Sequence, residues 1–348
     1  MNVRRVPSHG RLIATAAASA AGLLALSACG SSNAADGKSG GKLDVVASFY
    51  PMQFLAEQIG GEHVHVDALT KPGVEPHDLE LSPKQTVDLA NADMILYLKD
   101  LQPAVDKAIG QSGVEHIVDA ATLTSLEAHT ASEDHEGHGH EDEGHGEDGH
   151  SDEGHSDEGH SDEHAEEGHS HETEAGEDPH IWLDPVKYAE VAEGVGKALQ
   201  KADPEHAADY EKNTEELVAK LDALDKDFAD GLKNTETKTF ITTHAAFGYL
   251  AERYGLDQEA ISGLSPEAEP SPARIKELQD TAERENVSTV FFETLTSDKT
   301  AKTLAGDTGL RTDVLDPLEG ITEKSRGADY LEVMRSNLAA LQKALGAK

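Results

Sequence analysis

A long segment near the middle of the chain lacks the residues that a folded core requires. Residues 129–178 hold 11 of the 19 histidines and 20 carboxylate side chains, with no lysine, no arginine and no apolar residue larger than alanine. Gly-His-Ser-Asp-Glu occurs three times in succession, and this five-residue period matches neither a helix nor a strand. Such a composition cannot bury enough apolar surface to offset the entropy of ordering the chain. We therefore predict a disordered loop, which confines any fold to the segments before and after it.

Short apolar runs recur in both flanking segments and alternate with amphipathic stretches. They cover residues 43–49, 64–69, 94–98 and 116–118 before the loop, and residues 239–243, 259–262, 287–292 and 312–315 after it. Runs of this length separated by helical patterns are typical of parallel strands with crossover helices. Ser82 followed by Pro83 marks one of the helix starts. The sequence predicts an α/β fold with two βα, Rossmann-like lobes.

A long helix is expected between the two lobes. Residues 203–233 open with the helix-start pair Asp203-Pro204. Their apolar residues share one helical face: Leu217, Leu221, Leu224 and Phe228. About 28 helical residues at roughly 1.5 Å per residue would extend on the order of 40 Å, enough to reach both lobes. We predict a rigid backbone helix that joins them.

The N-terminus has the pattern of an export signal. Three arginines lie before an uncharged apolar run at residues 12–28, and the only cysteine, Cys29, follows directly. The sequence Leu26-Ser27-Ala28-Cys29 resembles the lipobox of bacterial lipoproteins, so we expect cleavage before Cys29 and lipidation of its thiol. The chain would then be anchored by lipid to the outer face of the cell membrane.

These patterns divide the chain into seven parts. The first two are a signal peptide (1–28) and a flexible, glycine-rich tether (29–42). The others are the first lobe (43–128), the loop (129–178), a return to the first lobe (179–202), the connector helix (203–233) and the second lobe (234–348).

The loop carries side chains that bind divalent metals. Imidazole is a common ligand of borderline metals, and neighbouring carboxylates favour the approach of a cation. Because no fixed geometry is specified, we expect weak, exchanging sites at ten histidines: His135, His138, His140, His145, His150, His155, His160, His164, His169 and His171. The net charge of −38 at pH 7 excludes nucleic acid as a partner, since its phosphates would be repelled. A tight site needs ligands that the folded segments hold in a preformed arrangement.

Candidate ligands for a tight site lie where the expected strands end. In an open α/β sheet, ligands bind beyond the carboxyl ends of the strands. Three histidines and one aspartate lie after strands or where the loop rejoins the fold: His77, His180, His244 and Asp316. Three imidazoles with one carboxylate or water suit tetrahedral zinc. Taken singly, each residue has a structural alternative, such as a cap, a buried core histidine or a turn.

With these segments in this order, the chain resembles the solute-binding lipoproteins of ABC importers for zinc and manganese, the cluster A-I receptors, and among them the ZnuA-like zinc branch. The resemblance spans residues 43–348 and rests on the lipobox, the histidine-rich insertion, the connector helix and the order of the ligand segments. It implies a metal site in the cleft between the lobes. His77 and His180 would come from the first lobe, and His244 and Asp316 from the second.

The resemblance also implies selectivity for zinc. His244 stands at the position where manganese receptors of this family typically have glutamate, and imidazole suits zinc better than manganese. Two features depart from the family pattern. Pro76 lies where some zinc receptors have a glutamate before the first histidine, and a second cysteine for the disulfide found in some second lobes is absent.

The resemblance implies a monomeric extracytoplasmic receptor that delivers Zn²⁺, as cargo, to an ABC permease and is not an enzyme. Two alternatives stay open: a receptor for manganese or another divalent metal, and a surface metal buffer or adhesin. A zinc hydrolase also holds its metal through three protein ligands. The sequence has no H-E-x-x-H motif, and the segments expected to form strands and helices contain no nucleophile elbow, which disfavours that class.

Overall fold

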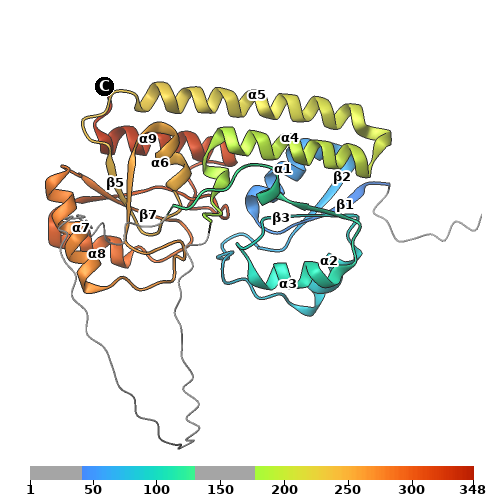
Figure 1. Ribbon diagram of the computed structural model, residues 1–348, viewed down its shortest axis with the longest axis horizontal. Coiled ribbons are helices and arrows are strands. Elements are labelled where there is room, and N and C mark those ends of the chain that lie inside the picture. The colour runs from blue at the N-terminus through green and yellow to red at the C-terminus, as the bar shows by residue number, and fades with distance from the viewer. Residues whose placement is uncertain (1–40, 130–176) are drawn as a thin grey trace, which may run out of the picture. The chain divides into compact units, whose positions relative to one another are not determined.

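The computed structural model describes residues 41–129 and 177–348 (Figure 1). The expected signal peptide, the lipidation site Cys29, nearly all of the tether and the ten loop histidines lie outside these residues. Among the residues described, no helix combines the length and the apolar character needed to cross a membrane.

A four-stranded parallel sheet with strand order β2-β1-β3-β4 forms the first lobe. Its strands are β1 (Leu43–Ala47), β2 (Val64–Ala68), β3 (Met94–Tyr97) and β4 (His116–Asp119). The helices of this lobe are α1 (Tyr50–Gly60), α2 (Pro83–Asn91) and α3 (Pro103–Ser112), with the 3-10 turns η1 (Gly61–His63) and η2 (Ala120–Thr122). The last three residues of β1 are buried, as expected for a central strand covered on both faces.

The second lobe repeats this topology with strand order β6-β5-β7-β8. Its strands are β5 (Thr239–Thr242), β6 (Asp257–Ala260), β7 (Thr289–Phe292) and β8 (Arg311–Val314). Its helices are α6 (Gly248–Tyr254), α7 (Pro272–Arg284), α8 (Lys299–Thr308) and α9 (Tyr330–Leu345). All four residues of the central strand β5 are buried.

Two long helices and two short turns join the lobes. They are η3 (Ile181–Leu183), α4 (Pro185–Ala202), η4 (Pro204–His206) and α5 (Ala207–Leu232). Helix α5 packs along α4 and contacts both α1 of the first lobe and α9 of the second (Figure 1). One continuous apolar core includes Val45 of β1, Phe228 of α5 and Phe240 of β5. The two lobes therefore share one core across the joining helices.

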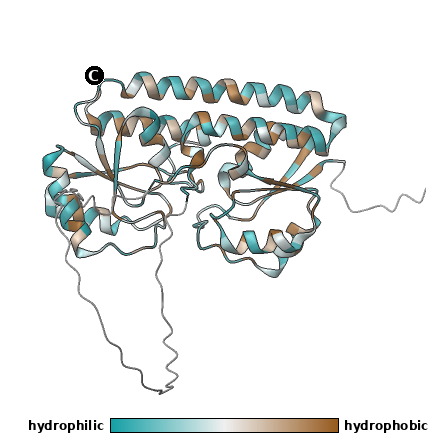
Figure 2. Cartoon of the chain, viewed as in Figure 1, coloured by the Kyte–Doolittle hydropathy of each residue, from teal (hydrophilic) through white to brown (hydrophobic). Residues whose placement is uncertain are grey.

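The predicted fold class is confirmed, since each expected strand overlaps an observed one. Helices α4 and α5 carry both hydrophilic and hydrophobic residues along their length (Figure 2). The predicted start at Ser82 is also present, since Ser82 and Gln85 form a capping box at the first turn of α2. The connector differs at its start. Asp203 and Pro204 begin the turn η4, and α5 begins only at Ala207.

Candidate metal centre

Three histidines from distant parts of the chain meet between the lobes. His77 lies in the loop after β2, His180 lies immediately before η3, and His244 follows β5. Their ring centroids are 5.4 to 6.3 Å apart. The structure therefore brings together the three imidazoles that the sequence predicts as metal ligands.

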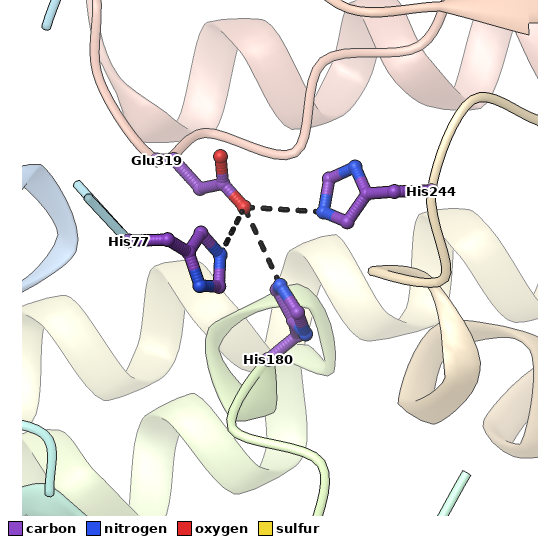
Figure 3. A group of neighbouring side chains, drawn as sticks. All are labelled: His77, His180, His244 and Glu319. Carbon is purple, nitrogen blue, oxygen red and sulfur yellow. Dashed lines mark hydrogen bonds and ion pairs between the residues drawn. The ribbon is translucent and has the colours of Figure 1, made fainter. Parts of the chain in front are cut away.

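A carboxylate oxygen lies at the centre of this group. Glu319 Oε1 is 3.3 Å from the Nε2 atom of each of His77, His180 and His244 (Figure 3). One ligand atom from each of the four residues lies within 4.8 Å of the others. The side chains of His180, His244 and Glu319 are fully buried, whereas that of His77 is 14% exposed. The site is thus almost closed to solvent and lined by three nitrogens and one oxygen.

Two of the imidazoles are held in one orientation by a carboxylate on the far side of the ring. Asp178 Oδ1 lies 2.7 Å from Nδ1 of His180, and Glu293 Oε1 lies 2.6 Å from Nδ1 of His244. A ring that donates its Nδ1 proton to a carboxylate leaves the Nε2 lone pair free for a metal. In both residues that Nε2 atom is buried and makes no hydrogen bond to the described part of the chain. These orphaned acceptors, aimed at one point, fit a bound cation.

The electrostatics of the group favour a positive charge at its centre. Burial opposes ionisation of Glu319, but the surrounding imidazoles outweigh it, and the pKa of this carboxyl lies well below its ordinary value. Burial likewise opposes protonation of His244, yet the carboxylates of Glu293 and Glu319 hold its pKa well above the ordinary value. The pKa of His180 is raised despite burial, mainly by Asp178. The carboxylates around the imidazoles thus favour a positive charge at the centre of the group.

Asp316, the fourth ligand expected from the sequence, is not part of this group. Its Oδ1 accepts the N–H of Leu318 at 2.9 Å and its Oδ2 accepts the hydroxyl of Thr294 at 3.1 Å. Leu318 has a φ of 59°, in the left-handed region, so the chain turns sharply at this point. Asp316 holds the turn, and Glu319, three residues later, reaches the histidines. Asp316 and Glu319 lie in the same short loop, and the local sequence does not indicate which of the two acids is the ligand.

A second glutamate lies beside the site. This residue, Glu75, directly precedes Pro76 in the sequence. Its Oε1 accepts the backbone N–H of His77 at 3.1 Å. Burial, with a further contribution from the nearby carboxylate of Glu319, raises the pKa of Glu75 to about 9. This shift favours the neutral form of Glu75, which limits the negative charge that it adds to the group.

The only tryptophan lies against the site. The ring centroid of Trp182 is 5.1 Å from that of His180, and its indole nitrogen donates to the carbonyl of Pro317 at 2.7 Å. Because Trp182 is fully buried and contacts a candidate ligand, its emission can report what happens at the centre.

The chain matches proteins of known family over most of its length. The model of the family described as "ZnuA: Zinc-uptake complex component A periplasmic" matches residues 45–344. The high-affinity zinc uptake system protein ZnuA of Bacillus subtilis (strain 168) is 37% identical over 335 residues, which cover 94% of this chain and 95% of that protein.

Two further relatives extend the comparison. The zinc-binding lipoprotein AdcA of Streptococcus pneumoniae serotype 4 is 36% identical over 92% of this chain, but the match covers only 58% of AdcA, which is longer. The crystal structure of the Zn(II)-bound ZnuA-like domain of S. pneumoniae AdcA has a TM-score of 0.67 and 32% identity, covering 88% of this chain and 99% of that one.

Proposed function

Because the chain belongs to the zinc-uptake complex component A (ZnuA) family, we propose that it is an extracytoplasmic zinc receptor that binds one Zn²⁺ between its lobes. His77, His180, His244 and Glu319 hold the ion, and Zn²⁺ is cargo, not a resident cofactor. The receptor delivers it to an ABC permease and performs no chemistry on it. The proposal is carried by one observation: a single buried carboxylate oxygen lies 3.3 Å from three Nε2 atoms.

The composition of the centre favours zinc over manganese. Three imidazole nitrogens and one carboxylate oxygen match the ligand number and type of tetrahedral zinc. Manganese prefers sites richer in oxygen ligands. With four protein ligands the coordination sphere is complete. A catalytic zinc instead keeps a position for water, so the centre supports a carrier and not a hydrolase.

The other parts of the chain serve this receptor. We propose that lipid on Cys29 anchors it outside the membrane, and that residues 29–42 form the tether. The histidines of residues 130–176 capture zinc in many weak sites and raise its local concentration. The lobes at 43–128 and 234–348, with the return segment 179–202 and the connector at 203–233, hold the tight site, and the receptor acts as a monomer.

A titration tests the division between tight and weak binding. The chain without residues 130–176 keeps Asp178, which orients His180. For this shortened chain, we expect calorimetry and Trp182 emission to report one tightly bound Zn²⁺. The full chain should bind the same tight ion and, in addition, further ions with lower affinity. His244→Ala should abolish the tight phase, whereas His65→Ala, which removes a half-exposed surface histidine, should leave it intact. Loss of tight binding on removal of the segment alone would refute the proposal.

A further inference from the structure

A second group of metal-binding side chains lies outside the cleft. One ligand atom each from Glu127, His129 and Glu252 lies within 4.8 Å of the others. Nε2 of His129 is 2.9 Å from Oε2 of Glu252, which lies on α6 of the second lobe. His129 is 18% exposed and Glu252 is 61% exposed, so solvent and ions reach this group directly.

His129 is held in the same way as the histidines of the cleft. Its Nδ1 lies 2.9 Å from Oδ2 of Asp178, the carboxylate whose other oxygen, Oδ1, lies 2.7 Å from Nδ1 of His180. Asp178 is fully buried, and each of its two carboxylate oxygens holds one imidazole. Since Nδ1 is occupied in both rings, Nε2 of His180 points into the cleft and Nε2 of His129 points to the surface group.

The His129 ring is also held by close packing contacts. The ring packs edge-on against Tyr249, with 4.4 Å between centroids. It also covers Gly248, where an added Cβ would lie 2.5 Å from the ring. A ring fixed by one carboxylate and two packing contacts is preorganised, in contrast to a histidine on a free chain.

The side chains of the group can accommodate a cation. The carboxylates of Glu127 and Glu252 and the imidazole of His129 each place one ligand atom within 4.8 Å of the others, so an ion between them can be bound by all three. Nζ of Lys187 already lies 2.8 Å from Oε1 of Glu127. A carboxylate has about four lone-pair sites, so Glu127 can accept from Lys187 and still bind an ion.

We propose that Glu127, His129 and Glu252 form a second site for Zn²⁺ or a similar borderline divalent cation, weaker than the cleft, with Asp178 as the positioning residue of both sites. This goes beyond the proposed receptor function and needs no metal in the cleft. One imidazole and two carboxylates supply three ligands, and water completes the sphere. The partial exposure of both glutamates allows them to close on the ion.

Anomalous diffraction at the zinc edge locates the ion directly. Crystals of the full mature chain soaked in excess Zn²⁺ should show a cleft peak and a second peak within about 2.0–2.2 Å of Nε2 of His129 and a carboxylate oxygen of Glu252. Glu252→Gln should lose the second peak and keep the first, whereas Glu283→Gln, on the exposed face of α7, should keep both. A full cleft peak with nothing at His129, or a second peak that persists in Glu252→Gln, would overturn the proposal. An empty cleft would contradict the receptor function instead.

A solution experiment tests the role of Asp178. After one equivalent of Zn²⁺, further zinc should protect His129 from carbethoxylation, measured by mass spectrometry, in the wild type but not in Glu252→Gln. Gly248→Ala should also lose protection because its Cβ displaces the ring, whereas Gly306→Ala, which meets no neighbouring atom, should not. Asp178→Asn should weaken both sites by roughly 10–100-fold. An Asp178→Asn variant that weakens only the cleft would overturn the shared positioning.

Discussion

Replacing Glu319 by glutamine tests the centre most sharply because it removes a charge and keeps the shape of the side chain. Unit charges 3.3 Å apart interact by about 5 kcal/mol at an effective dielectric constant of about 20. Removing one partner of a buried charge pair typically costs about 3–5 kcal/mol. We therefore expect Glu319→Gln to weaken zinc binding by about 10²–10⁴-fold, at about 1.4 kcal/mol per factor of ten.

The matched control is Asp316→Asn, in the same loop. Its Oδ1 would still accept the N–H of Leu318, so the turn should persist and the affinity should change by less than about tenfold. Competition against a chelating dye, on the chain without residues 130–176, measures both variants, and Trp182 emission provides an independent signal. Near-normal binding by Glu319→Gln together with loss of binding by Asp316→Asn would show that Asp316, and not Glu319, is the fourth ligand.

Four further measurements follow from the structure. Zinc binding should release protons at pH 7, because the pKa values of His180 and His244 are raised in the metal-free protein. Affinity should then rise with pH, by up to about tenfold per pH unit for each proton displaced, until the pH passes the raised pKa values. Released protons are taken up by the buffer, so a calorimetric enthalpy of zinc binding that is the same in every buffer would contradict proton release. Glu293→Gln should lower affinity by roughly 10–100-fold at unchanged stoichiometry, and an unchanged affinity would show that Glu293 does not orient His244. Phe228→Ala should reduce the free energy of unfolding by about 3–5 kcal/mol in urea titrations of metal-free protein, and a loss below about 1 kcal/mol would argue against the shared core. Spin labels at Lys107 and Glu283, on α3 and α7, should keep their separation on zinc loading, and a shift above about 2 Å would show that the lobes move despite that core.

The sequence predicted the strands well because a parallel strand buried on both faces reads as an apolar run. Residues 239–243 are an example: β5 spans Thr239–Thr242, and His244 follows at its carboxyl end, where ligands of α/β folds lie. The three histidines could be selected on this basis, since each lies next to an expected element. That the three side chains converge on one point could be established only from the structure.

The parts that the sequence did not predict depend on contacts between distant residues and on one backbone angle. Leu318, directly before Glu319, adopts a positive φ after Pro317, and nothing in the local pattern predicts this turn. The role of Asp178 depends on its contact with His129, 49 residues earlier in the chain. Glu293 follows β7 directly, and its contact with Nδ1 of His244 also spans 49 residues.

In the coordination that we propose, one Zn²⁺ binds Nε2 of His77, His180 and His244 together with a carboxylate oxygen of Glu319. X-ray absorption at the zinc edge, on the chain without residues 130–176 loaded with one equivalent, measures that coordination directly. This coordination predicts four light-atom ligands at about 2.0–2.1 Å and the multiple scattering of three imidazoles; in His77→Ala, the scattering of only two imidazoles is expected. A spectrum with one imidazole or none, or one that His77→Ala leaves unchanged, would contradict it.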